Sequence, residues 1–182
     1  MLFRETPLKG AFVVELQPHK DDRGEFARAW CREEFARAGI EIAMVQGNVS
    51  TNPERGTLRG MHYQLAPHGE AKLVRCVRGA IYDVIIDIDP ASPSYRRWFG
   101  IELTPQSRTM LYVPTTCAHG FQTLLDDTEV NYLVSSPYAP AAARGVRYDD
   151  PALAIEWPLP VSRISDADRN WPLLERDLSA VA

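Results

Sequence analysis

The sequence predicts one mainly β domain, a sandwich or closed barrel with a few short helices. The chain has 182 residues, which suits a single domain with a sizeable core. Many short β-rich runs follow one another, and Gly, Pro, Asp or Asn separates each from the next, whereas only two stretches have a helical pattern. Numerous short strands with regular turn signals are typical of sandwiches and barrels.

The expected elements follow one another along the chain. β-branched and aromatic residues predict strands over 11–16, 56–64, 72–77, 80–89, 98–103, 109–113, 120–125 and 129–135. Residues 31–38 and 172–177 predict two short helices. No internal repeat, low-complexity tract or long linker divides these elements. We therefore expect residues 1–182 to form a single domain.

The run over 80–89 is apolar on both of its faces. Val84 and Ile86 share one face, and Ile81 and Ile85 share the other. A strand that is apolar on both faces is covered on both sides. The barrel interior supplies one cover, and a second sheet or a partner subunit is expected to supply the other.

Composition argues against several functional classes. The net charge of −4 provides no basic field that would attract nucleic acid. No apolar run is long enough for a signal peptide or a membrane span, so we expect no membrane partner. The three cysteines, Cys31, Cys76 and Cys117, are far apart and lack metal-ligand spacing. They predict a reduced, cytoplasmic protein with free thiols.

Hairpin geometry gathers polar residues from neighbouring strands. A two-residue turn at 78–79 places Lys72 and Asp83 on one face, and a loop over 65–71 adds His62 to that face. A further turn, at residues 126–127, places His119 and Tyr132 on one face. If both faces point into the same barrel, these residues form one polar pocket in an apolar lining, which is the usual form of a ligand site.

These side chains suit one kind of chemistry. A carboxylate such as Asp83 fixes the tautomer of His62 and raises its basicity. Lys72 can stabilise a developing oxyanion, and Tyr132 can donate a proton from the other side. Together they suit removal of a proton next to a carbonyl and reprotonation from the opposite face. That reaction is an epimerisation through an enolate, and it needs no cofactor.

The same residues lie in stretches that resemble the dTDP-4-dehydrorhamnose 3,5-epimerase family. The resemblance covers nearly the whole chain in order and spacing. Its most specific part is the motif around His62 together with the later Ala118-His119-Gly120-Phe121. The matching stretches are 22–26, 46–50, 58–64, 72–75, 79–87, 118–121, 150–151, 155–158 and 165–168, with Tyr132 and Tyr138.

The resemblance implies a fold, an assembly and a reaction. The implied fold is a cupin-type jelly-roll β-barrel with a few short helices, on which a C-terminal segment of about 160–182 packs. The implied assembly is a homodimer that exchanges N-terminal strands. The implied substrate is the nucleotide sugar dTDP-4-dehydro-6-deoxyglucose, whose C3 and C5 centres are inverted without metal or cofactor.

The resemblance also implies roles for individual residues. His62 is the base, and Asp168 replaces Asp83 as its expected carboxylate partner. Asp83 then orients His119, and these two residues support the site. Tyr132 is the acid on the opposite face, and Lys72 stabilises the enolate oxygen. The catalytic and supporting residues expected are therefore His62, Tyr132, Lys72, Asp168, His119 and Asp83.

A second group of residues is expected to bind the nucleotide. Arginine suits diphosphate oxygens, and aromatic rings can stack on the base. The expected substrate-binding residues are Arg23, Phe26, Arg28, Gln46, Asn48, Ser50, Arg59, Tyr138 and Arg169. Arg59 and His62 have opposite strand parity, so a β-bulge at Gly60 is needed to turn both inward. Arg28 and Ala143 stand where the family commonly has acidic residues, which leaves the identity of the base open.

Three alternatives remain. A metal-dependent cupin usually places two histidines one residue apart, but here Gln64 follows His62 in that spacing, and Gln64 or His119 would have to serve as a ligand. A single-centre epimerase or a ketoisomerase for another nucleotide sugar would use the same pocket. A non-catalytic cupin that binds a sugar nucleotide is the alternative outside enzymes.

Overall fold

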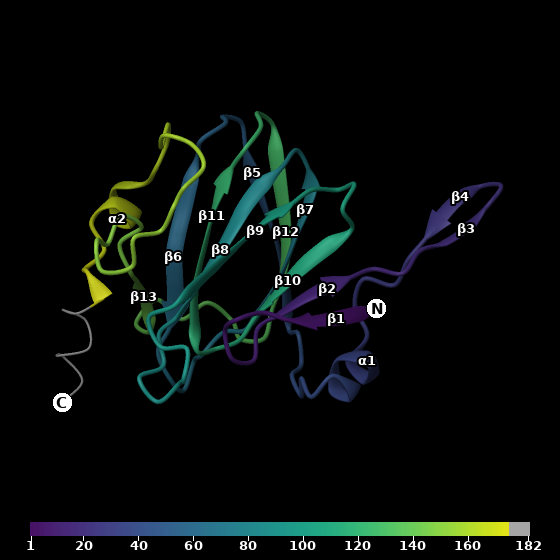
Figure 1. Ribbon diagram of the computed structural model, residues 1–182, viewed down its shortest axis with the longest axis horizontal. Helices are drawn as coiled ribbons and strands as arrows, with labels where there is room; N and C mark the ends of the chain where they lie inside the picture. Colours follow the sequence, from purple (N-terminus) through teal and green to yellow (C-terminus); the bar gives the residue numbers. More distant parts are fainter. Residues whose placement is uncertain (175–182) are drawn as a thin grey trace.

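The computed structural model describes residues 1–174, and in these residues two antiparallel sheets face each other (Figure 1). This arrangement is the cupin-type jelly-roll barrel that the family resemblance implied. One sheet has six strands in the spatial order β1 (Leu2–Glu5), β2 (Phe12–Glu15), β10 (Thr109–Val113), β7 (Lys72–Arg78), β12 (Thr128–Val134) and β5 (Gln46–Asn52). The other has five, in the order β13 (Ala143–Gly145), β6 (Leu58–Gln64), β11 (Cys117–Thr123), β8 (Ile81–Asp87) and β9 (Trp98–Leu103).

All eight strands expected from the sequence are present, with small shifts at their ends. The helix expected at 31–38 is α1 (Arg32–Arg37). Half of the helix expected at 172–177, residues 175–177, lies outside the described part of the chain. The strands that we did not expect include β5, whose sequence is polar and contains glycine. It forms because every residue of β5 pairs with β12, so tertiary pairing overrides its weak local propensity.

The three hairpins expected from the sequence are wrong. β7 pairs with β10 and β12, whereas β8 pairs with β9 and β11. The turn at 78–79 therefore crosses from one sheet to the other. The connections from β6 to β7 and from β11 to β12 cross in the same way. A strand that is apolar on both faces gives no local signal that distinguishes a hairpin from such a crossing.

Each sheet has a buried outer face as well as an inner one. Between the sheets lies an apolar core that includes Val74, Ile85 and Phe121. Phe35 of α1 covers the outer face of the six-stranded sheet and is fully buried there. Leu174 packs with strand residues on the outer face of the five-stranded sheet.

The prediction that both faces of the 80–89 strand are covered is confirmed. Val84 and Ile86 pack against Val146, Leu153 and Leu174. The chain's own segment after β13 therefore supplies the second cover, and the expected second sheet or partner subunit does not. This segment also carries α2 (Asp166–Arg169), which contacts β6.

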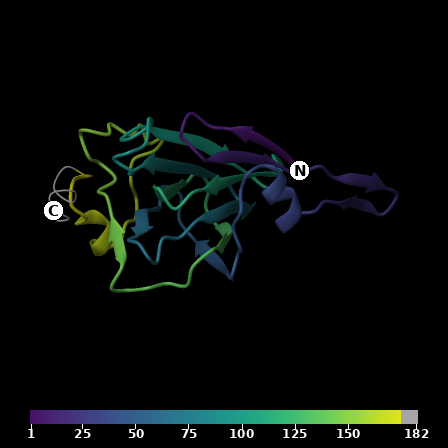
Figure 2. The same cartoon turned by 90° about the horizontal axis from the view of Figure 1, so that it is seen from below.

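A two-stranded arm stands away from the two sheets. It consists of β3 (His19–Asp21) and β4 (Gly24–Phe26), and all its strand residues are exposed. Figures 1 and 2 show the arm at one end of the molecule and α2 near the other. Within the described residues, no helix is long and apolar enough to cross a membrane.

Candidate active site

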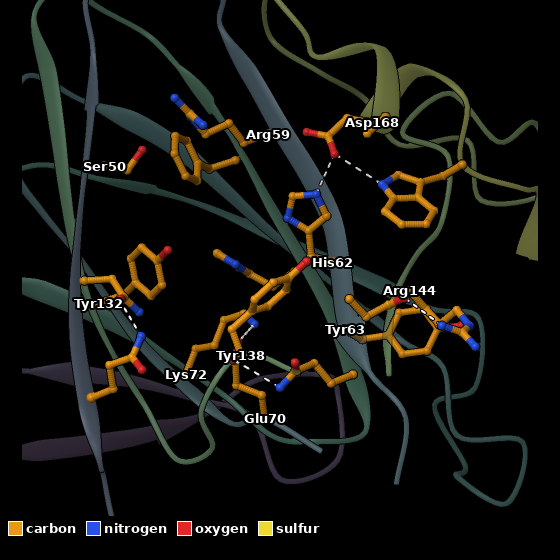
Figure 3. Close-up of a pocket in the computed structure, with 18 residues that line it drawn as sticks. Ser50, Arg59, His62, Tyr63, Glu70, Lys72, Tyr132, Tyr138, Arg144 and Asp168 are labelled. Carbon is orange, nitrogen blue, oxygen red and sulfur yellow. Dashed lines mark hydrogen bonds and ion pairs between the residues drawn. The ribbon is translucent and has the colours of Figure 1, made fainter. Parts of the chain in front are cut away.

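A cavity of about 540 Å³ lies between the two sheets (Figure 3). β5, β7 and β12 line it from the six-stranded sheet, and β6, β11 and β13 from the other. Its volume is in the range of small-molecule sites. The lining residues are Gln46, Asn48, Ser50, Arg59, His62, Tyr63, Gln64, Glu70, Lys72, His119, Phe121, Tyr132, Tyr138, Ala143, Arg144, Ala167, Asp168 and Trp171.

His62 of β6 is paired with the carboxylate of Asp168. The His62 Nε2 atom lies 2.6 Å from Asp168 Oδ1, and the other carboxylate oxygen accepts the backbone N–H of Gly60 at 3.2 Å. The His62 side chain is 44% exposed and its partner only 8%, so the imidazole faces the cavity while the carboxylate lies behind it. Ser165 caps α2 by accepting the N–H of Asp168, which anchors the carboxylate's backbone.

The charge of Asp168 follows from its hydrogen bonds. Burial opposes ionisation, but donation by His62, by the Gly60 N–H and by Trp171 outweighs it and holds the pKa of this carboxyl below its ordinary value. An ionised carboxylate only accepts hydrogen bonds, so Nε2 of His62 carries the proton. The Nδ1 atom is then the acceptor, and it is the atom free to act as a base.

A second histidine–carboxylate pair has its histidine in the cavity wall and its carboxylate behind that wall. His119 of β11 is directly opposite His62, and its Nε2 atom lies 2.8 Å from Asp83 Oδ1. Burial raises the pKa of Asp83, against the opposing effect of His119. Asp83 faces Phe121 on the adjacent strand and does not line the cavity. The local assignment of Asp83 to His62 is therefore wrong, because it depended on a hairpin that does not form.

Lys72 is buried on the six-stranded side of the cavity. Its ammonium is paired with the carboxylate of Glu70, and both side chains are about a tenth exposed or less. The Gln64 amide also donates to Glu70, at 3.4 Å. Lys72 is therefore a buried cation at the cavity and not a solvated charge at the edge of a strand.

Tyr132 faces the cavity from β12. Burial raises the pKa of its phenol, the negative charge of Glu70 adds to this effect, and Arg59 opposes it. The phenol therefore keeps its proton at neutral pH. His62 and Tyr132 come from facing sheets, so a molecule bound between them presents opposite faces to the two groups (Figure 3).

The bulge expected at Gly60 is confirmed. His62 is paired with His119 and Arg59 with Phe121, so two residues of β6 stand opposite Gly120 alone. Gly60 has a φ of 138°, and a Cβ atom there would lie 2.5 Å from the Gly120 Cα atom. The bulge requires the two glycines and turns both Arg59 and His62 toward the cavity.

Polar side chains line the cavity beside β5. Gln46, Asn48 and Ser50 alternate along this strand, and the Gln46 amide donates to Asn48 Oδ1 at 2.7 Å. The Arg59 Nε–H donates to Asn52 Oδ1 at 2.7 Å, which fixes the guanidinium near these groups. Tyr138 is 67% exposed and also lines the cavity.

Four of the expected substrate-binding residues do not line this cavity. Arg23 is at the tip of the arm, where its guanidinium binds Asp21. Phe26, on the same arm, is 72% exposed. Arg28 follows the arm and pairs with Glu34 of α1 at 2.8 Å. Arg169 ends α2 and is exposed.

The structure adds lining residues that sequence reasoning missed. Glu70 and Trp171 are the most important, because they contact Lys72 and Asp168 respectively. Glu70 gave a weak signal, since it stands two residues before Lys72 in the sequence. Trp171 gave no signal, because it contacts β6 in the fold but lies far from β6 in the sequence. Tyr63, Phe121 and Arg144 complete the apolar and basic parts of the lining.

The donor groups do not match the metal-binding alternative. No group of three or more His, Cys, Asp or Glu suited to a metal occurs within residues 1–174. The Gln64 amide nitrogen donates to the backbone oxygens of His68 and Pro137, and its oxygen accepts the Ala139 N–H at 2.6 Å. His119 is engaged with Asp83. Both proposed substitute ligands are thus held by protein contacts.

Comparison with known proteins identifies the family. The family model for dTDP-4-dehydrorhamnose 3,5-epimerase matches residues 5–176. A dTDP-4-dehydrorhamnose 3,5-epimerase of Methanothermobacter thermautotrophicus is 40% identical over 178 residues, which cover 95% of this chain and 95% of the relative. A dTDP-4-dehydrorhamnose 3-epimerase of Streptomyces niveus is 37% identical over 175 residues, which cover 96% and 84%.

A solved structure agrees with these matches. The crystal structure of dTDP-4-dehydrorhamnose 3,5-epimerase from Bacillus anthracis, with TDP and PPi bound, has a TM-score of 0.91 to this chain. The two sequences are 38% identical, and the match covers 94% of this chain and 98% of the other. With a family model that spans nearly all its length, this chain belongs to the dTDP-4-dehydrorhamnose 3,5-epimerase family.

Proposed function

We propose that this protein is a cofactor-independent epimerase that converts dTDP-4-dehydro-6-deoxyglucose to dTDP-4-dehydro-L-rhamnose. The observation that carries the proposal is the His62–Asp168 pair, which faces Tyr132 across one cavity. A base and an acid on opposite walls are what inversion of a carbon centre requires. Positioned acid and base groups each contribute roughly 10²–10⁴-fold to such a reaction.

The reaction follows from the placement of these groups. The C4 carbonyl of the sugar acidifies the C–H bonds at both C3 and C5. His62 Nδ1 removes one of these protons, and the electron pair moves onto the C4 oxygen as an enolate. The buried ammonium of Lys72 stabilises that charge. Tyr132 then delivers a proton to the opposite face of the same carbon, which inverts it.

After each inversion the two groups must be reset. His62 has gained a proton, and Tyr132 has lost one and become a phenolate. Proton exchange with water returns both side chains to their starting states. Repetition at the second carbon completes the double epimerisation. Asp168 favours the reaction because its negative charge stabilises the imidazolium that forms next to it.

The nucleotide end of the substrate needs cations and hydrogen-bond donors. Arg59 supplies the planar fork that suits diphosphate oxygens, and the polar side chains of β5 lie beside it. The exposed ring of Tyr138 is available to the base. These groups support a nucleotide sugar as the ligand.

We propose that the protein is a homodimer in which each arm completes the partner's cavity. Arg23, Phe26 and Arg28 do not reach the cavity of their own chain. Phe26 is largely exposed on a hairpin that stands away from the sheets (Figure 2). The protruding arm therefore leaves this ring and the Arg23 side chain available to a second copy of the chain. Residues 1–182 then act as one domain with an exchanged N-terminal part.

A narrower reaction is the second candidate. The Streptomyces niveus relative is named a 3-epimerase, and its identity to this chain is similar to that of the double epimerases. The same acid–base pair is compatible with inversion of one sugar carbon or of two. Arg28 and Ala143 stand where the family commonly has acidic residues. The second candidate therefore includes action on a different nucleotide sugar.

We also propose a reducing, cytoplasmic location. Burial raises the pKa of the Cys76 thiol to about 11 and that of the Cys117 thiol to about 12, so neither is readily ionised and oxidised. Cys31 is a third free thiol, and it is partly exposed. A protein with three free thiols is suited to a compartment where thiols stay reduced.

The test is product formation without any added metal or cofactor. Purified protein is incubated with dTDP-4-dehydro-6-deoxyglucose in the presence of EDTA, and the sugar is followed by ¹H NMR. We expect dTDP-4-dehydro-L-rhamnose to form at the same rate with and without the chelator. Inversion at C3 alone would support the narrower reaction. Failure to convert any 4-keto-6-deoxy nucleotide sugar would refute the enzymatic proposal.

A further inference from the structure

Trp171 touches the carboxylate that serves the proposed base. Its indole Nε1–H donates to Asp168 Oδ1 at 3.2 Å, and His62 Nε2 lies 2.6 Å from that same oxygen. The two rings meet edge to face, with centroids 6.3 Å apart and an interplanar angle of 74°. One carboxylate oxygen is therefore shared by the histidine and the indole.

The indole is held in place by its packing. It lies against the backbone of β13, where a Cβ atom on Gly145 would come within 2.4 Å of the ring. A glycine at this position is what allows the ring to approach so closely. The ring is half-buried and forms part of the cavity wall. Such close packing leaves the indole N–H little freedom to turn away from Asp168.

We propose that Trp171 is a positioning residue, whose indole N–H fixes the orientation of Asp168 and, by sharing Oδ1, limits how strongly the carboxylate holds a proton on His62. This inference rests on the proposed function only in that His62 is the base. The contact itself is a property of the folded chain. No part of the proposal requires Trp171 to touch the substrate.

The physical argument concerns the donors around Asp168. Among residues 1–174, three groups donate to the carboxylate: His62, the Gly60 N–H and Trp171. Each donor withdraws electron density and lowers the affinity of the carboxylate for a further proton. Without the indole N–H, the carboxylate would attract the imidazole proton more strongly. The His62–Asp168 pair would then take up a proton at higher pH.

The test replaces the donor and keeps an aromatic ring. In Trp171→Phe, the titration of the His62 imidazole is followed by ¹H–¹³C NMR in the free protein. The midpoint should rise by roughly 0.5–1 pH unit, because a carboxylate that has lost one donor stabilises the neighbouring imidazolium more strongly. The acid limb of kcat/KM against pH should rise by the same amount. An unchanged or lowered midpoint would overturn the inference.

Trp157→Phe is the matched control. The Trp157 indole donates to the Tyr148 backbone oxygen and does not line the cavity. This variant should leave the His62 midpoint unchanged. If it raised the midpoint as much as Trp171→Phe does, the effect would be a general consequence of losing an indole, and the inference would fail.

A second measurement needs no change at position 171. The chain has four tryptophans, so a ¹H–¹⁵N spectrum of the wild-type protein contains four indole signals. One of them should shift with the titration of His62 and lose that shift in His62→Asn. If none of the four follows His62, the inference is wrong. Neither NMR measurement requires turnover, so an inactive protein would count against the proposed function alone.

Discussion

Asp168 is the residue on which the chemistry of the site depends most. It is the buried partner of His62, and it comes from a segment that lies outside the two sheets. Its charge fixes the tautomer of the imidazole and stabilises the imidazolium. An amide in its place would keep the shape but lose the charge.

Asp168→Asn should therefore reduce kcat by roughly 10²–10⁴-fold while the fold is retained. The reason is that the amide neither stabilises the imidazolium nor fixes the tautomer with Nδ1 free. Steady-state rates on the 4-keto nucleotide sugar measure the effect. Asp166→Asn is the control, because Asp166 is exposed in the same helix. A variant of Asp168 that is as active as the control would contradict the assignment.

The same carboxylate should also make stability depend on pH. Its pKa is lowered in the folded protein from an ordinary value of 3.8, so folding favours the ionised form. The stabilisation is present at pH values well above the ordinary pKa of 3.8 and is lost as pH falls through the lowered pKa. Urea unfolding at pH 7 and at pH 3 should show that wild type and Asp168→Asn differ less at the lower pH. A difference that is constant with pH would contradict this.

At the scale of elements, the bulge in β6 aligns Arg59 and His62. Its position was predictable, because only a bulge lets two residues of opposite parity face the same side. The close contact between Gly60 and Gly120 explains why both positions are glycine. The bulge is therefore a part of the site and not an irregularity of the sheet.

Gly60→Ala tests this element. The new methyl group would meet the Gly120 backbone at 2.5 Å, in addition to the strain of a φ of 138°. We expect a loss of more than about 2 kcal/mol of unfolding free energy, and reduced activity because His62 is displaced. Gly24→Ala is the matched control, since Gly24 has a φ of 130° but no neighbour within 4 Å. Equal losses for the two variants would show that backbone strain alone matters at Gly60.

The strands were largely predictable and their pairing was not. Apolar patterns and turn residues locate β7 and β8, but both faces of these strands are buried. Local sequence therefore does not say which strand each of them joins. β5 was missed because its stability comes from pairing with β12 and not from its own residues.

The whole molecule explains why wrong hairpins still gathered the right residues. A tight crossing between facing sheets folds the chain back on itself as a hairpin does. The same inward side chains then meet across the interior, without backbone hydrogen bonds between their strands. His62, Lys72, His119 and Tyr132 accordingly share one cavity. Asp83 is the exception, because it lies behind His119.

Other parts of the site lie beyond local reasoning. Asp168 and Trp171 come from a segment about a hundred residues after His62 in the chain. No spacing rule connects positions so far apart. The resemblance to a family supplied Asp168, and only the fold revealed Trp171.

The proposed exchange of arms leads to a prediction about mixed dimers. One variant lacks a working arm, through Arg23→Ala and Phe26→Ala, and the other is His62→Ala. Each alone should have little activity, but mixing them after partial unfolding should restore up to about a quarter of it. The mixed dimer unites an intact arm with an intact cavity. The epimerisation rate is measured before and after mixing. If a verified mixed dimer shows no increase in rate, the proposed exchange of arms is contradicted.

The central claim is that His62 removes the proton next to the sugar carbonyl. The most direct measurement is deuterium incorporation from D₂O into dTDP-4-dehydro-6-deoxyglucose, read by NMR. The wild-type protein should place deuterium at both C3 and C5, and His62→Asn should place none. Tyr132→Phe should keep part of the exchange while product formation falls. Exchange in His62→Asn at the wild-type rate would contradict the account.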